Sequence, residues 1–147
     1  MMVEGAKLLN LPIIVTEQYP KGLGHTAAEI KAVLPSGIEI IEKTTFSSCA
    51  AQQFEVQLGG RGLKQVLACG IEAHICVNQT VHDLLAGGFQ VHLLTGCIAS
   101  RHPANKMVAL RKMLMSGAIP CSIEMALFEL MRDAKHEHFK AIQELIK

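Results

Sequence analysis

The chain has 147 residues, half of them apolar, and its formal net charge at pH 7 is +1. This length suits one domain with a sizeable core, which we expect over residues 1–147. The near-neutral charge and the absence of lysine and arginine clusters argue against nucleic acid as the main partner. No apolar stretch is long enough to span a membrane, and residues 1–10 do not resemble a signal peptide. We therefore expect a cytoplasmic protein.

Five cysteines show neither CxxC spacing nor an even-numbered framework, so a disulfide scaffold or a zinc ribbon is not expected. The histidines also lack partners at metal-binding spacing. His136 and His138 are two positions apart on an expected helix and point to different faces. The sequence thus predicts reduced thiols, no metal ion and no cofactor.

Short apolar runs alternate with amphipathic segments along the chain. The expected strands cover residues 11–16, 38–41, 66–68, 90–94 and 118–121. The expected helices cover residues 1–10, 26–34, 48–58, 77–88, 103–116, 123–134 and 139–146. Loops are expected at 17–24 and 96–102, and a turn at 59–62. This alternation predicts an α/β fold with three layers, in which helices cover both faces of a mostly parallel sheet.

The carboxyl ends of parallel strands meet at one edge of such a sheet, where ligands bind. Glu17, Lys43, Cys76 and the loop over residues 96–102 each follow an expected strand. The strand pattern alone therefore predicts that these residues converge.

Cys76 stands where the strand over residues 66–68 and a following glycine lead into an amphipathic helix. A thiol in the first turn of a helix lies near unpaired N–H groups and the positive end of the helix dipole, which stabilise its thiolate. A buried, inert cysteine is the competing interpretation, since cysteine is among the most often buried residues.

The segment G-I-E-A-H-I-C-V, residues 70–77, resembles the nucleophile segment of the isochorismatase-like cysteine hydrolases, which include nicotinamidases. The segment T-E-Q-Y-P-K-G-L-G, residues 16–24, resembles a branch of that family whose substrates are unassigned. The resemblance runs from about Leu8 to the C-terminus. It implies that Cys76 is the nucleophile and that the backbone N–H groups of Glu72 and Cys76 form an oxyanion hole. It also implies a cis Ile71–Glu72 peptide bond, substrate contacts from Glu17 and Tyr19, and a homo-oligomer.

Lys43, in the segment E-K-T-T-F-S, matches the family's lysine. An ammonium group near a thiol stabilises the thiolate and developing negative charge. A solvated lysine after a strand is the competing interpretation.

The family's third catalytic residue, an aspartate on the first central strand, has no counterpart, because Asp83 and Asp133 lie in expected helices. That strand would precede Met1, so we expect it to be absent and the chain to be N-terminally shortened relative to the family. Its two neighbours, the strands over residues 11–16 and 66–68, would then each lack a partner. Glu17 is the one candidate to replace the aspartate.

The resemblance thus implies a hydrolase that uses Cys76 and Lys43 on a small amide, imide or enol-ether substrate. The alternative is a catalytically impaired homologue that serves as a binding or assembly module. A nucleotide-binding module is disfavoured, because no glycine-rich phosphate loop follows a strand.

Overall fold

The computed structural model describes residues 1–60 and 62–147. Arg61, in the turn expected at 59–62, lies outside the described residues. The expected α/β class is confirmed, because helices alternate with strands and every strand pair is parallel. Among the described residues, no helix is long and apolar enough to cross a membrane.

The elements follow the chain in the expected order. The strands are β1 (Val15–Gln18), β2 (Ile40–Lys43), β3 (Gln65–Ile71), β4 (Gln90–Ala99) and β5 (Ile119–Cys121). The α-helices are α1 (Met2–Leu8), α2 (Pro20–Leu23), α3 (Ala28–Val33), α4 (Gln52–Gly59), α5 (Asn78–Ala86), α6 (Pro103–Met115), α7 (Ile123–Met131) and α8 (Phe139–Leu145). A 3-10 turn, η1 (Ser48–Ala50), precedes α4, and a π-helical turn, η2 (Ala73–Val77), precedes α5.

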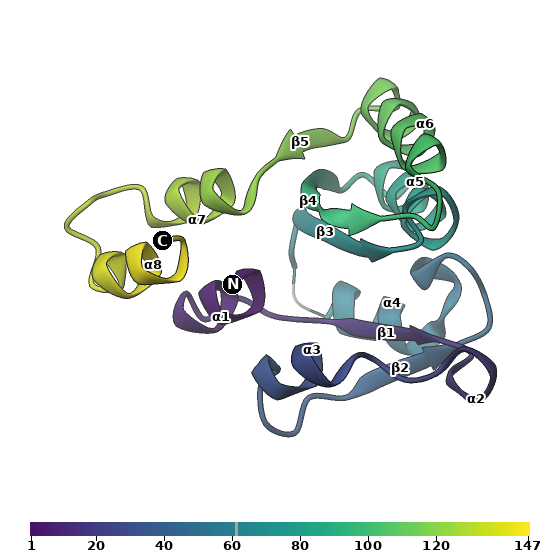
Figure 1. The fold of residues 1–147 in the computed structure, drawn as a ribbon, viewed down its shortest axis with the longest axis horizontal. Coiled ribbons are helices and arrows are strands. Elements are labelled where there is room, and N and C mark those ends of the chain that lie inside the picture. Colours follow the sequence, from purple (N-terminus) through teal and green to yellow (C-terminus); the bar gives the residue numbers. More distant parts are fainter. Residues whose placement is uncertain (61) are drawn as a thin grey trace.

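The strands form two separate parallel sheets (Figure 1). One contains β1 and β2, and the other contains β3, β4 and β5 in that order. Among the described residues, β1 pairs only with β2, and β3 pairs only with β4. Each of these two strands therefore keeps one unpaired edge within the described part of the chain.

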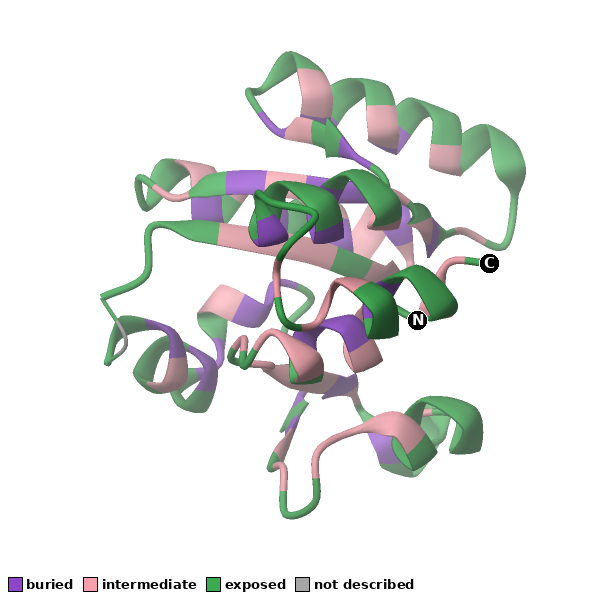
Figure 2. Cartoon of the chain, turned by 90° about the vertical axis from the view of Figure 1, so that its left-hand side faces the viewer, coloured by how far each residue is buried: buried purple, intermediate pink, exposed green. Residues whose placement is uncertain are grey.

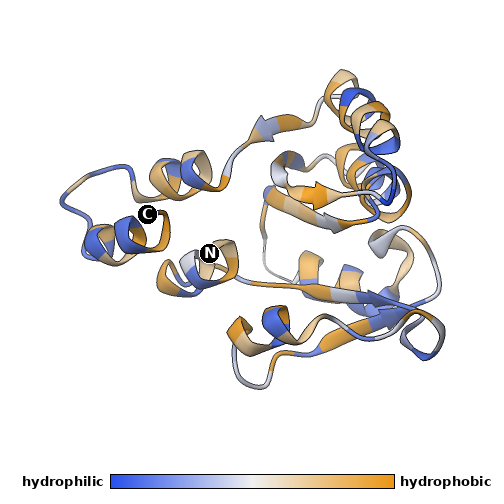
Figure 3. Cartoon of the chain, in the orientation of Figure 1, coloured by the Kyte–Doolittle hydropathy of each residue, from blue (hydrophilic) through white to orange (hydrophobic). Residues whose placement is uncertain are grey.

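The main core lies on one face of β4. Val91 and Leu93 are fully buried there with residues of α5 and α6 such as Leu84 and Met113. The intervening residue Leu94 points to the opposite face and packs in a second cluster with residues of β5 and α7. This alternation is the period of two of a strand covered on both sides. Figure 2 shows the resulting burial, and Figure 3 shows apolar residues concentrated along β4 and along the segment leading into β1.

The N-terminal and C-terminal helices pack together. Leu127 and Met131 of α7 and Ile142 of α8 form a third buried cluster, against which Met2 and Leu8 of α1 pack. Gly5 allows this approach, because a Cβ atom there would lie 2.5 Å from a methyl group of Leu127. These contacts connect the two ends of the chain.

Several expected boundaries were wrong, among them the end of the strand expected over 38–41, which is found at Ile40–Lys43 and so includes Lys43. The first strand covers Val15–Gln18 rather than residues 11–16, so Glu17 belongs to the strand and not to the loop. β1 pairs with β2 only from Val15 onward, where the register begins with Ile40. Residues 96–99, expected in a loop, continue β4, because Gly70 and Ile71 of β3 pair with Ile98 and Ala99.

Candidate active site

Cys76 lies in η2, the π-helical turn between β3 and α5. The peptide bond between Ile71 and Glu72, where the strand ends, is cis, as the resemblance implies. The N–H groups of Ile75 and Val77, on either side of Cys76, both donate to the Glu72 carbonyl oxygen, at 3.1 and 3.3 Å. The Cys76 side chain is half-buried and is therefore accessible. π-Helical turns are frequent at functional sites.

Lys43 is the last residue of β2 and is buried, with 7% of its surface exposed. Its ammonium group donates to Gln18 Oε1 at 2.6 Å and to the carbonyl oxygens of Thr45 and Phe46, both at 2.9 Å. These three acceptors satisfy the three ammonium hydrogens. Burial lowers the pKa of Lys43, and the neighbouring Cys76 opposes this effect. The ammonium group therefore gives up its proton more readily than an exposed lysine would.

Gln18 connects Lys43 with Cys76. The Cys76 sulfur lies 3.8 Å from the same Gln18 Oε1 atom that accepts the Lys43 hydrogen bond. The structure thus brings together two of the residues that the sequence placed at this edge. The sequence did not identify Gln18 as a site residue. Its side chain is a neutral amide, and neither its charge nor its spacing from other residues indicates a role.

A chain of hydroxyl groups supports the turn that holds Cys76. Thr80 Oγ1 donates to the Cys76 carbonyl oxygen at 2.7 Å and accepts from the Ser48 N–H at 2.9 Å. The Ser48 hydroxyl is 3.2 Å from that of Thr16. These bonds link α5, η1 and β1, so the thiol is fixed relative to the strand that carries Gln18.

The Glu17 carboxylate is directed at the loop after β1. It is buried and accepts hydrogen bonds from the Thr26 N–H at 2.6 Å and from His25 Nδ1 at 2.9 Å. Burial opposes ionisation of Glu17, but the hydrogen bonds from Thr26 and His25 outweigh it and lower its pKa to about 2. An anion held this firmly is a poor base, and its bonds support the loop over residues 17–26.

The Glu72 side chain binds the end of β4. Its Oε2 accepts from the Arg101 N–H at 3.1 Å and lies 3.4 Å from Arg101 Nε and 3.5 Å from His74 Nδ1. The hydrogen bond from the Arg101 N–H is the main reason that the pKa of Glu72 is lowered. These contacts fix the residue whose N–H group the resemblance assigns to the oxyanion hole.

Tyr19 stands directly after Gln18 and is half-exposed, with a positive φ of 40°. Its ring lies against Gly22, where a Cβ atom would come within 2.3 Å of the ring. Tyr19 and Lys43 line an open hollow together with Glu42, Gln53 and their neighbours. Cys76 is not among the lining residues.

Fold and site together define an α/β protein with a cysteine–lysine pair at a sheet edge. The isochorismatase domain model matches residues 1–125. The chain therefore belongs to the isochorismatase family.

Relatives of the chain carry the same family name. It is 44% identical to isochorismatase domain-containing protein 2A of Mus musculus, over 99% of the chain and 69% of the mouse protein. A structure described as the MAR1 ribonuclease of Caenorhabditis elegans superposes with a TM-score of 0.93 at 39% identity, over 99% of the chain and 74% of that structure. The YcaC gene product of Escherichia coli, described as an octameric hydrolase of unknown specificity, shares the fold with a TM-score of 0.86 at 22% identity, over 99% and 76%.

Proposed function

We propose that the chain is an isochorismatase-like hydrolase domain that uses the Cys76 thiolate on a small amide, imide or enol-ether substrate. The observation that carries the proposal is the meeting of the Lys43 ammonium and the Cys76 sulfur at one atom, Gln18 Oε1. An ammonium group at this position stabilises a thiolate, which is the reactive form of cysteine.

In the first step, the Cys76 thiolate attacks the carbonyl carbon of the amide and forms a carbon–sulfur bond. The carbonyl oxygen becomes an oxyanion, which accepts hydrogen bonds from the backbone N–H groups of Glu72 and Cys76. The contacts of Glu72 with Arg101, and those of Thr80 with the Cys76 carbonyl, keep these two amides in place.

In the second step, the carbon–nitrogen bond breaks and the amine leaves with a proton from the Lys43 ammonium. The lowered pKa of Lys43 suits it to this transfer. Water then attacks the thioester and returns a proton to Lys43, and the carbon–sulfur bond breaks to release the acid and the thiolate. Glu17 and Tyr19 shape the approach to the site, Glu17 through the loop that it supports and Tyr19 through the hollow beside Lys43.

The test is hydrolysis of a panel of small amides and imides, with ammonia or amine release as the readout. Cys76→Ser and Lys43→Met should abolish turnover, and Lys43→Arg should retain the charge but lose the proton transfer. Cys69→Ser is the matched control, because this exposed thiol lies on β3 outside the site. An RNA substrate belongs in the panel, because the Caenorhabditis elegans chain is described as a ribonuclease. Turnover that survives Cys76→Ser would contradict the proposal.

A binding or assembly module is the second candidate function. It is favoured by one observation: among the described residues, no carboxylate contacts the Cys76 sulfur. If this candidate is correct, small carbonyl compounds bind at the site without turnover. Isothermal titration with the amides of the panel, compared between the unaltered chain and Cys76→Ser, distinguishes the two.

We also propose that the protein associates with itself in a compartment that keeps its thiols reduced, such as the cytoplasm. The unpaired edges of β1 and β3 favour association, and so does the outer face of α6. On that face Met107, Val108 and Met115 are each about 70–80% exposed. Light scattering of the unaltered chain and of Val108→Lys tests this, since the substitution should lower the oligomeric mass.

A further inference from the structure

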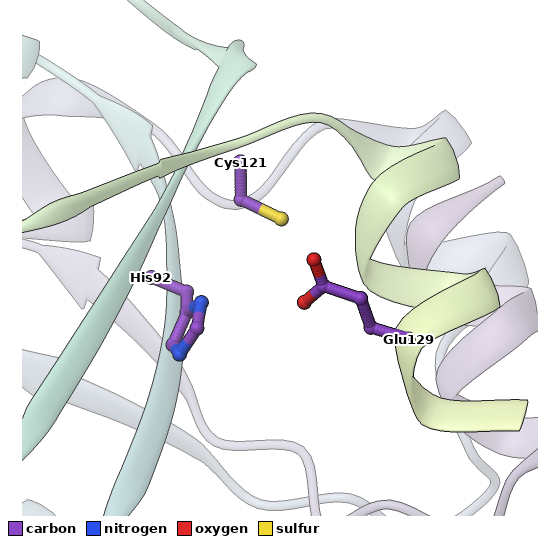
Figure 4. A group of neighbouring side chains, drawn as sticks. All are labelled: His92, Cys121 and Glu129. Carbon is purple, nitrogen blue, oxygen red and sulfur yellow. The ribbon is translucent and has the colours of Figure 1, made fainter. Parts of the chain in front are cut away.

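Three side chains that can bind metal meet on the sheet face that α7 covers. They are His92 of β4, Cys121 of β5 and Glu129 of α7 (Figure 4). One ring nitrogen, the sulfur and one carboxylate oxygen all lie within 4.8 Å of one another. The figure shows the sulfur and the carboxylate facing each other, with the imidazole beside them.

The fold dictates this meeting. Leu94 pairs with Cys121 across the parallel ladder, and His92 lies two residues earlier on the same face of β4. Ala126 of α7 packs against Leu94 and Cys121. Glu129 is three residues beyond Ala126, so it projects from the same side of the helix toward the sheet. The spacing of residues in the sequence does not reveal this group of metal-binding side chains, because its members come from three separate elements.

The donor atoms have few other polar partners. Within residues 1–60 and 62–147, neither the His92 ring nor the Glu129 carboxylate makes a hydrogen bond or ion pair, and the Cys121 thiol makes one hydrogen bond, to the Ser122 carbonyl oxygen at 3.3 Å. Cys121 is 3% exposed, while Glu129 is exposed. The sulfur is therefore fixed, and the carboxylate can close on a bound ion.

We propose that His92, Cys121 and Glu129 bind a zinc ion that fastens α7 to the β3–β4–β5 sheet. Nitrogen, thiolate and carboxylate oxygen are the three ligand types of Zn²⁺, which binds them at about 2.0–2.3 Å. Tetrahedral ligands at these lengths lie about 3.5 Å apart, so small rotations of His92 and Glu129 complete the site. The Cys121 thiol releases its proton to solvent on binding, and a water molecule fills the fourth position.

This site is separate from the cysteine–lysine pair. Cys121 and Leu94 belong to the cluster on one face of the sheet, whereas Val77, next to Cys76, packs in the main core on the other. The ion therefore serves to stabilise the structure. A metal ion that binds the folded state but not the unfolded state raises the unfolding temperature as its concentration rises above the dissociation constant.

The test is titration of the reduced, metal-free full chain with Co²⁺ and then Zn²⁺. Co²⁺ should bind one ion per chain with a thiolate charge-transfer band and the strong d–d bands of a tetrahedral site, and Zn²⁺ should displace it. His92→Gln and Glu129→Gln should weaken binding by about 100-fold. Cys121→Ser should remove the charge-transfer band. His102→Gln and Cys69→Ser are matched controls that should bind as the unaltered chain does, because both residues lie outside the group.

Glu129→Gln keeps the proposal testable if Cys121→Ser fails to fold, because Glu129 is exposed. Unfolding temperatures should rise with Zn²⁺ in the unaltered chain and in both controls, but not in Glu129→Gln. The proposal is overturned if the charge-transfer band is absent, if it survives Cys121→Ser, or if it is lost in Cys76→Ser instead.

Discussion

Lys43 and Cys76 both contact a single oxygen atom, Oε1 of Gln18, which lies 2.6 Å from the lysine nitrogen and 3.8 Å from the sulfur. Lys43 is the last residue of β2, and Cys76 lies in η2, which follows β3 of the other sheet. Gln18 of β1 is therefore the contact through which the β1–β2 sheet meets both the Lys43 ammonium and the Cys76 thiol.

Replacing Gln18 with leucine should destabilise the protein by about 1–3 kcal/mol, because the buried Lys43 ammonium loses one of its three acceptors. Urea unfolding measures this. Lys43→Met removes the group that is left unsatisfied, so Gln18→Leu should cost less in that background. Equal costs in both backgrounds would show that the two side chains are not coupled.

Glu17 should make the free energy of unfolding depend on pH in the acidic range. Its pKa is lowered from 4.5 to about 2 in the folded protein, so the unfolded chain binds the proton first as the pH falls. Its contribution is therefore complete above about pH 4.5 and is lost progressively toward pH 2. Glu17→Gln should be less stable than the unaltered chain at pH 7, and the difference should shrink below pH 4.5. A difference that is constant over this range would contradict the assignment.

Thr80 should contribute to the stability of the folded protein through its hydroxyl group. Thr80→Val removes the bond to the Cys76 carbonyl and leaves the Ser48 N–H without its acceptor, which should cost about 1–3 kcal/mol. Thr80→Ser retains the hydroxyl and is the matched control. Thermal unfolding of the two variants should differ clearly, and similar loss in both would point to the methyl group instead.

Much of the architecture could be predicted from the sequence because apolar periodicity and turn residues mark the elements directly. Helix α6 is an example, since the helix expected over residues 103–116 is found at Pro103–Met115. The limits of β1 could not be predicted in this way. Residues 11–14 are as apolar as a strand, but pairing with β2 begins only at Val15. Strand limits depend on the partner, and the partner is remote in sequence.

The site was predictable to the extent that its residues carry charge or a reactive group. Lys43 and Cys76 were identified because each follows an expected strand, and in the structure both contact Gln18. Gln18 and the group around Cys121 were missed, although His92, Cys121 and Glu129 do carry reactive or charged groups. Their significance arises from side chains that meet across elements, and no local pattern reports such a meeting.

The most direct test of the central claim is the rate at which iodoacetamide alkylates Cys76 near neutral pH, resolved by mass spectrometry of the peptide. Cys76 should react faster than free cysteine. Lys43→Met should slow it by about tenfold through loss of one adjacent charge, and Lys43→Arg should not. The account is contradicted if Cys76 reacts no faster than free cysteine, or if its rate is the same in Lys43→Met.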